Sequence, residues 1–327
     1  MDSKCSLAKS LCIAAMTVAM TATAHAAALR TFVSGFGNDS NTATNCSHAQ
    51  PCRTFAMAVT VTSSGGEIEA LDPAGYGPIT ISGPLTLVGL PGAAVNAPAG
   101  GTGITINAGP NDAVHLQGLL IDGSGLGATG ISFTAGKFLT IQDCLIRNLT
   151  SHGIAFTPVV ASPLVSLHVS STTVANNGGH GILVFPSGTG GVTATFDRIQ
   201  VIGNGTPGSG SDGLVAISTN LTTGQLSAVV TESVASRNSN VGFGVVGSTV
   251  LATLSVFRST ASLNLTGLES DGNADLTFAR TAVTGNSTGI LMQQSGQMHS
   301  FRDNYLFGNP MSDITGGSIN LHFIDTD

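Results

Sequence analysis

Charged side chains recur at a fixed distance before a repeated asparagine. Arg198, Glu232 and Arg258 each stand six residues before such an asparagine, and Asp197 and His168 lie close to this column. The functional interpretation is a groove that grips an acidic or neutral sugar chain, because guanidinium groups bind carboxylates well. The structural interpretation is an outward ladder of charges, in which each opposite pair contributes well under about 1 kcal/mol. The residues alone leave both interpretations open.

Three further polar residues occupy equivalent positions just before a repeated glycine. These are His152, His180 and Asp212, which precede Gly153, Gly181 and Gly213. Stacked side chains of these types could bind a metal ion, since imidazole and carboxylate groups are common ligands. Three polar residues at turns give the same pattern without a metal. We therefore predict no metal site.

Both sets of polar residues belong to a sequence repeat of 22 to 32 residues. The repeat length is measured between the glycines of successive Gly-apolar pairs, from Gly103 to Gly289. An asparagine recurs within it, with apolar residues three and eight positions earlier in most units. The unit around Asn148 fits only if one residue is deleted. The repeated asparagines are Asn148, Asn177, Asn204, Asn238, Asn264, Asn286 and Asn309.

This period predicts a solenoid, because each unit is too short for a propeller blade. Each unit contains short β-prone stretches separated by Gly, Asn and Ser, such as residues 276–278, 281–283 and 289–292, and no sustained helical period. We therefore expect one coil of a parallel β-helix per unit, with three short strands. Matching asparagines would meet between coils and exchange amide hydrogen bonds. N-glycosylation at the Asn-Leu-Thr and Asn-Ser-Thr triplets is the alternative role for these residues.

The N-terminus has the features of a secretory signal peptide. Lys4 and Lys9 precede an apolar run from Leu11 to Met20, and Ala24-His25-Ala26 is a small-x-small cleavage site. We expect secretion to the periplasm or the extracellular space, with no membrane span after cleavage. The expected organisation is a signal peptide (1–26), an N-terminal region with a short capping helix near 53–61 (27–66), a parallel β-helix (67–321) and a tail (322–327).

The bulk composition excludes one large class of partner. Charged residues make up 9% of the chain against about 25% in typical soluble proteins, and 18 acidic residues face 11 basic ones. Since affinity for nucleic acid comes from neutralising phosphates with Lys and Arg, we expect no nucleic-acid partner. Cys46 and Cys52 flank a polar loop and could form a disulfide in an oxidising compartment, whereas Cys144 is expected to be a buried thiol.

The capping helix, the passage "SSGGEIEALDPAGYGPITI" and the coils rich in Asn and Gly resemble the secreted right-handed parallel β-helix proteins, the pectate-lyase-like superfamily. The resemblance covers roughly residues 30 to 320. It implies an all-β, right-handed parallel β-helix with three short strands per coil. Lyases, hydrolases, epimerases, phage tailspikes and adhesins share this scaffold, so the resemblance does not fix an activity.

Members of this superfamily that act on uronic-acid polymers are similar to one another in their catalytic groups. They need either a basic residue that removes a proton together with Asp and Glu residues that bind Ca²⁺, or a cluster of Asp residues. Gly179-His180-Gly181 and Arg198-Ile199-Gln200 match two motifs of the polygalacturonase-like hydrolases in part, but Asn-Thr-Asp and Asp-Asp are missing. The long loops at 185–191 and 218–225 contain no acid or base. We therefore predict a protein that binds a polysaccharide or cell-surface glycan without catalysis or a cofactor. A divergent polysaccharide lyase or glycoside hydrolase acting on uronic-acid glycans is the alternative, with Ca²⁺ only in that case.

Overall fold

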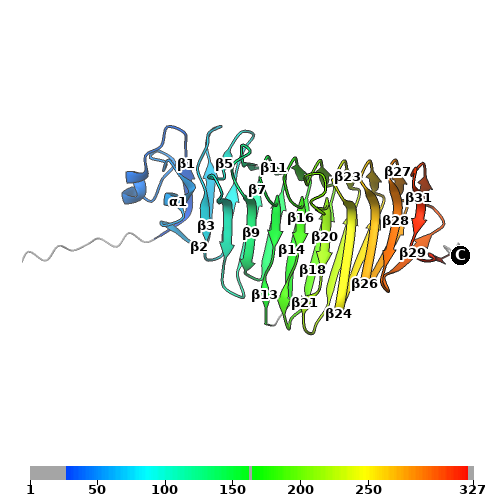
Figure 1. The fold of residues 1–327 in the computed structure, drawn as a ribbon. Coiled ribbons are helices and arrows are strands. Elements are labelled where there is room, and N and C mark those ends of the chain that lie inside the picture. Colours follow the sequence, from blue (N-terminus) through cyan, green and yellow to red (C-terminus); the bar gives the residue numbers. More distant parts are fainter. Residues whose placement is uncertain (1–26, 162–163, 323–327) are drawn as a thin grey trace, which may run out of the picture.

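The computed structural model describes residues 27 to 161 and 164 to 322, and these form a single elongated solenoid (Figure 1). The predicted signal peptide and residues 323–327 of the predicted tail lie outside the described residues. The chain winds through three stacks of parallel strands, one strand of each stack per coil. The predicted all-β parallel β-helix is therefore confirmed, and one of its sheets has nine strands, one for each of nine coils.

The first stack contains the longest strands and is called the long-strand stack. β1 (Ala28–Val33) pairs with its first member. Its members are β2 (Thr62–Ala70), β4 (Leu85–Val88), β7 (Ala113–Gln117), β10 (Phe138–Gln142), β14 (Val165–Ser170), β18 (Val192–Asp197), β22 (Leu226–Thr231), the later parts of β24 (Val241–Phe257) and β26 (Thr266–Ala279), β29 (Gln297–Phe301) and β32 (Asn320–His322).

The next strand of each coil belongs to the short-strand stack, a separate sheet. Its members are β5 (Ala94–Asn96), β8 (Leu120–Asp122), β11 (Leu145–Arg147), β15 (Thr173–Ala175), β19 (Gln200–Ile202), β23 (Val234–Ser236), β25 (Thr260–Ser262), β27 (Ala282–Thr284) and β30 (Tyr305–Phe307).

The third stack completes each coil. Its members are β3 (Ile79–Ile81), β6 (Thr102–Asn107), β9 (Thr129–Ala135), β12 (Ile154–Phe156), β16 (Ile182–Val184), β20 (Leu214–Ile217), the earlier parts of β24 and β26, β28 (Thr288–Gln293) and β31 (Ser312–Thr315). Because β24 and β26 run through both stacks without a break, the third and long-strand stacks count as one sheet. The loops between them carry a small sheet of β13 (Val159–Val160), β17 (Ser187–Gly188) and β21 (Asn220–Leu221).

The core fills the inside of the coils with aliphatic and aromatic side chains in register. Ile141, Val169 and Phe196 follow one another on adjacent strands and are fully buried. Phe133 and Phe156 stack in the same way, with ring centroids 4.6 Å apart. Since alternate residues of a strand point to opposite faces, the outward positions are left for polar side chains.

Six asparagines form a continuous ladder at the corner before the third stack. The side-chain nitrogen Nδ2 of each of the first five donates to Oδ1 of the asparagine in the following coil at 2.9 to 3.2 Å, and Nδ2 of the last donates to Oδ1 of Asp313 at 2.8 Å. That Oδ1 also accepts the backbone N–H of the preceding asparagine, and from Asn204 onwards Nδ2 donates a second bond to a carbonyl of the preceding coil. The members are Asn177, Asn204, Asn238, Asn264, Asn286 and Asn309. Because these amides are buried and fully bonded, their role is structural.

Asn148 does not belong to this ladder, contrary to the sequence prediction. Its side chain donates instead to Asp122, at 3.3 Å to Oδ1, and its backbone is left-handed with φ of 57°. The turn has the same length as that of the next coil, since Arg147 pairs with Ala175 and Ile154 with Ile182. Asn148 therefore matches the left-handed Asn176, and Leu149 takes the inner position that Asn177 holds in the next coil. The backbone N–H of Leu149 donates to Oδ1 of Asn177 at 3.1 Å. The ladder therefore begins at Asn177.

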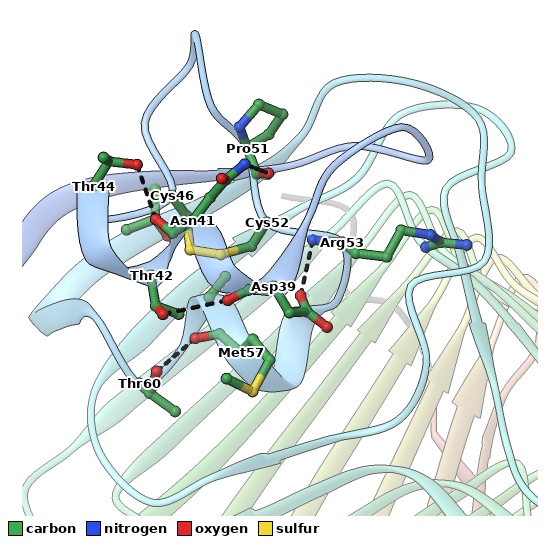
Figure 2. Close-up of a disulfide and its surroundings, with 12 residues drawn as sticks. Asp39, Asn41, Thr42, Thr44, Cys46, Pro51, Cys52, Arg53, Met57 and Thr60 are labelled. Carbon is green, nitrogen blue, oxygen red and sulfur yellow. Dashed lines mark hydrogen bonds between the residues drawn. A yellow bond between two sulfur atoms is a disulfide. The ribbon is translucent and has the colours of Figure 1, made fainter.

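The N-terminal end of the solenoid is covered by a short helix, as predicted, and also by a disulfide-closed loop (Figure 2). α1 (Phe55–Ala58) is shorter than the expected helix near 53–61, since Val59 already ends it. Phe55 and Ala58 are buried against the first coil. Cys46 and Cys52 form the predicted disulfide, next to the 3-10 helix η1 (Asp39–Thr44). The thiol of Cys144 is buried, also as predicted.

Candidate functional site

The charged column predicted from the sequence lies at the turn between the long-strand and short-strand stacks. One residue per coil adopts a left-handed backbone there, with φ between 48° and 53°. These residues are Asp143, Ser171, Arg198, Glu232, Arg258 and Arg280. The residue after each points inward, and Thr172, Ser233, Ser259 and Thr281 are buried there. A single left-handed residue turns the chain by the required angle and leaves its own side chain at the surface.

Hydroxyl groups form a second ladder behind this turn that the sequence analysis missed. Ser259 Oγ accepts the backbone N–H of Ser233 at 3.1 Å, and Ser233 Oγ accepts that of Ile199 at 3.1 Å. Thr172 Oγ1 does the same for Cys144 at 3.3 Å. These bonds hold the turns in register, so the charged side chains repeat at the spacing of the coils. The sequence pattern that could have predicted this hydroxyl ladder is a Ser or Thr five residues before most of the ladder asparagines.

The structure brings the predicted site residues onto one edge of the molecule but pairs them unevenly. Glu232 Oε1 lies 3.2 Å from Nε of Arg258 in the next coil. Arg198 pairs with its neighbour Asp197 at 2.6 Å, and Asp197 also accepts a hydrogen bond from Thr231 Oγ1 at 2.7 Å. His168 lies further back on β14, in the middle outward position. The predicted set is therefore two separate groups, and none of its members is enclosed.

One depression on this edge lies over the last three coils, and another of about 540 Å³ lies beside Asp143 and Ser171. A depression of about 350 Å³ is lined by Phe257, Arg258, Ala279, Arg280, Phe301 and Asp303. Phe257 and Ala279 are register partners on β24 and β26, and Phe301 follows in the next coil. The small side chain of Ala279 between two half-buried phenyl rings makes the hollow. Because coils are about 4.8 Å apart, the backbone positions of the two rings are separated by roughly 9.6 Å.

Two arginines border the depression and are both anchored through the same atom. Arg258 Nε donates to Glu232, and Arg280 Nε donates to Asp303 Oδ2 at 3.2 Å. Their side chains are 51% and 66% exposed. The carboxylates therefore orient the guanidinium groups, whose Nη nitrogens are the remaining donors. Such a fork suits the carboxylate of a ligand, which it can bind through two hydrogen bonds.

A second polar group lies on the third stack and was also missed. Burial raises the pKa of the Glu269 carboxyl to about 7, and the nearby Asp212 and Asp271 add to this rise. Gln293 Nε2 donates to its Oε1 at 2.6 Å, which acts in the opposite direction. The register partners of Glu269 on the third stack are Ala, Leu, Val or Gly in most other coils. A single Glu among these residues was the sequence pattern that could have indicated this group.

The predicted His-His-Asp stack is present beside Glu269. The rings of His152 and His180 are 5.3 Å apart and nearly parallel, and His180 Nδ1 lies 3.4 Å from Asp212 Oδ2. Nδ1 of each ring accepts a backbone N–H from the next coil, at 3.2 Å for His152 and 2.9 Å for His180. Burial and the neighbouring His180 lower the pKa of His152 to about 4. These bonds give the stack a structural role at the turn.

Neither the group around Glu269 nor the His-His-Asp stack has the arrangement of a metal centre. Among residues 27–161 and 164–322, no three or more His, Cys, Asp or Glu side chains are placed to hold a metal ion. The described part of the chain also has no helix long and apolar enough to cross a membrane. The depression at Arg258 and Arg280 is the candidate site for an organic ligand, because two exposed arginines and two phenyl rings line one hollow.

The aromatic part of this site was not foreseen from the sequence. Phe257 and Phe301 lie one and two residues before positions of the charged column, so the signal was there. Phe residues also fill the inside of the coils, as Phe196 and Phe278 do. Only the strand register distinguishes the outward rings from the inward ones.

No protein-family model matches the sequence, and no curated protein matches it either. Solved structures do resemble the fold. An alginate lyase from Paenibacillus sp. str. FPU-7 is 11% identical, with a TM-score of 0.55 over 90% of this chain and 100% of that one. The enzymatically active domain of bacteriophage CBA120 tailspike protein 2 is 14% identical, with a TM-score of 0.51 over 83% of this chain and 43% of that one. This chain therefore spans less than half of the tailspike chain.

The Azotobacter vinelandii mannuronan C-5 epimerase AlgE4 A-module is 13% identical, with a TM-score of 0.49 over 82% of this chain and 92% of that one. At these identities the comparisons concern the fold. The chain has the fold of the pectate-lyase-like β-helix proteins, as the resemblance in the sequence implied.

Proposed function

We propose that this protein is secreted and binds an acidic polysaccharide in the depression formed by its last three coils. The observation that carries the proposal is the combination of two exposed arginines with two phenyl rings around one hollow. Aromatic rings offer an apolar face to the C–H side of a sugar, and the guanidinium forks bind its carboxylates. The disulfide of Cys46 and Cys52 is compatible with an oxidising compartment.

The charge distribution favours this location over the rest of the surface. The chain has a formal net charge of −7, so an acidic polymer is repelled by the molecule as a whole. Binding must then depend on a local concentration of positive charge. Arg258 and Arg280 stand in successive coils, whereas Arg198 is the one positive residue at the turn positions of the four preceding coils. One structural relative is named as an alginate lyase, which supports a polysaccharide ligand.

The test compares single substitutions that remove the same charge. Arg280→Gln should weaken binding to sodium alginate or polygalacturonate about fivefold, as expected for the loss of roughly 1 kcal/mol from an exposed ion pair. Arg237→Gln is the matched control, because Arg237 is also exposed and left-handed but lies at another turn. Affinity is measured by calorimetry or affinity electrophoresis. Equal binding to a neutral dextran, or equal loss in the control, would refute the proposed site.

Cleavage of the bound polymer is a second candidate function, favoured by one contact. Asp275 Oδ1, which solvent does not reach, lies 2.9 Å from Nε2 of His299. Both residues point outward on β26 and β29, and Phe301 of the depression is only two residues beyond His299. A histidine oriented by a carboxylate is a suitable proton acceptor, and the arginines would neutralise the uronate carboxylate.

The corresponding reaction is a β-elimination. Proton removal from the carbon next to the carboxylate forms a carbon–carbon double bond, the glycosidic C–O bond breaks, and the leaving oxygen takes a proton. The acids of the described residues do not form a set of ligands for Ca²⁺, so no step of this reaction is assigned to that ion. The assay follows unsaturated products from uronate polymers, with and without Ca²⁺. His299→Gln should abolish product formation, whereas His115→Gln, in the same outward row seven coils away, should not.

A further inference from the structure

The rings around the depression at Arg258 and Arg280 repeat every second coil, although the backbone repeats every coil. Phe257 and Phe301 belong to one outward row of the long-strand stack, and Ala279 stands between them in the intervening coil. The backbone positions of the two rings are therefore about 9.6 Å apart. All three residues line the depression, and the small side chain of Ala279 leaves a gap between the rings.

The two arginines beside this row are anchored in opposite directions along the solenoid. Glu232, Arg258, Arg280 and Asp303 stand two residues before register partners of the short-strand stack, so they occupy equivalent turn positions of four successive coils. Arg258 Nε donates to Oε1 of Glu232 in the preceding coil, whereas Arg280 Nε donates to Oδ2 of Asp303 in the following coil. The two contacts are therefore centred two coils apart, or about 9.6 Å, while the arginine backbones are one coil apart.

This divergence of the guanidinium groups argues against a compact anion as the ligand. A single phosphate, sulfate or isolated carboxylate is bound most strongly when several donors converge on it. Glu232 and Asp303 hold the two arginines apart instead, and each guanidinium group has Nη donors left for a carboxylate of its own. A ligand with carboxylates at a regular spacing uses both groups.

A polyuronate with equatorial 1,4 linkages has the matching period. Each unit of such an extended chain advances by nearly the rise of one coil, and successive units are rotated by half a turn. Every second unit therefore presents the same face and the same carboxylate direction. The first and third of three units then meet Phe257 and Phe301 with the same C–H face, while their carboxylates reach the two guanidinium groups. The middle unit lies over Ala279, with its carboxylate turned away from the arginines.

We propose that the depression is specific for polyuronates with equatorial 1,4 linkages, and that it binds three consecutive units with the chain parallel to the solenoid axis. This inference rests on the proposed binding of an acidic polysaccharide and specifies the linkage geometry that the site accepts. Axial 1,4 bonds, as in polyguluronate and polygalacturonate, fold the chain and shorten its advance per unit. The third unit of such a chain falls short of the second ring and of the second guanidinium group.

Polymannuronate and polyguluronate of equal length provide the matched test, because their units are epimers with the same charge and differ in linkage geometry. In calorimetry with the full chain, polymannuronate should bind at least about tenfold more tightly, since polyguluronate loses a charge-assisted contact. A β-1,4-linked glucuronan should behave as polymannuronate does, and polygalacturonate as polyguluronate does. Equal affinities for all four polymers would overturn the inference but leave the proposed function intact. Binding to none of them would refute the proposed function, and the inference with it.

Oligomers of mannuronate test the number of units bound. The trimer should bind at least about tenfold more tightly than the dimer, because only the trimer reaches both rings and both guanidinium groups. The tetramer should add little to this. An even gain with each added unit, without a step at the third, would contradict the occupancy of three units.

A ring exchange tests the spacing itself. Ala279→Phe combined with Phe301→Ala keeps the composition but moves the second ring into the coil next to Phe257. The preference for polymannuronate over polyguluronate should fall at least about threefold, because the rings no longer match every second unit. Phe301→Ala alone is the control for the loss of the ring, and circular dichroism checks the fold. An unchanged preference in the exchanged variant would overturn the ring spacing as its cause. Since the oligomers are compared on the unaltered chain, they decide the inference even if the exchanged variant does not fold.

Discussion

The ladder of buried amides makes a quantitative prediction at its centre. Asn264 donates two hydrogen bonds through Nδ2, to Asn286 Oδ1 at 3.0 Å and to the carbonyl of Ala235 at 3.1 Å. Its Oδ1 accepts two more from Asn238, from the backbone N at 2.9 Å and from Nδ2 at 3.0 Å. Asn264→Ala removes all four bonds and leaves the N–H of Asn238 and the carbonyl of Ala235 buried without these partners.

Each buried polar group left unsatisfied costs about 1–3 kcal/mol, so the variant should lose about 2–6 kcal/mol of unfolding free energy. Asn264→Asp keeps the shape but removes both donors, and at neutral pH it also buries a charge, so it should be at least as unstable. Asn273→Ala is the control, since Asn273 is exposed and makes one long contact of 3.5 Å, and it should change stability by less than about 0.5 kcal/mol.

Urea unfolding followed by far-ultraviolet circular dichroism measures the change. Hydrogen exchange locates it, because each coil of a solenoid contacts only its neighbours and the loss should centre on the coils of Asn238 and Asn286. A loss of less than about 1 kcal/mol for Asn264→Ala, or one equal to that of Asn273→Ala, would show that the amide ladder does not stabilise the stack.

Three further predictions concern other parts of the chain. Gly267→Ala should destabilise by about 1–3 kcal/mol in thermal unfolding, because its Cβ would lie 2.5 Å from Val283 Cγ1, and an unchanged melting temperature would contradict this. The pKa of Glu269 is about 7 in the folded protein, so its carboxyl destabilises the fold as it ionises, and this loss of stability develops between pH 4.5 and 7. Glu269→Gln should therefore raise the unfolding free energy above pH 7 by about 3 kcal/mol at most and flatten its fall between pH 4.5 and 7. Parallel curves of stability against pH for the two proteins would refute this. Reduction of Cys46–Cys52 should cost about 2 kcal/mol, with increased hydrogen exchange confined to the N-terminal cap, and a change in the last coils would be the contrary result.

Much of the fold could be predicted because stacking imposes the same requirement on every coil. A buried amide column and two apolar columns at fixed spacing are satisfied together only when coils lie one above another. The prediction failed at Asn148, which occupies the left-handed position of Asn176, while Leu149 holds the inner position of the ladder. Asparagine occurs at both neighbouring positions of this turn, as Asn176 and Asn177 show, so matching by residue type alone placed Asn148 one position out of register.

The candidate site was predicted less completely. The turn column with Glu232 and Arg258 could be identified, since its residues keep a constant distance from the asparagines. The phenyl rings of Phe257 and Phe301 could not, because a phenylalanine at a strand end is compatible with the core as well as with the surface. The proximity of Asp275 to His299 also depends on the register between two coils.

The sequence by itself determined the repeat, the three strands per coil, the amide ladder from Asn177 onwards and the disulfide, since each depends on residue type and spacing within a unit. The tertiary structure decided which side chains of different coils share a surface, and so placed Ala279 between two rings and anchored Arg258 and Arg280 in opposite directions. The physical reason is that neighbours across coils are 22 to 34 residues apart in the chain. Their contact is therefore set by strand register and turn length together, which local sequence patterns do not specify.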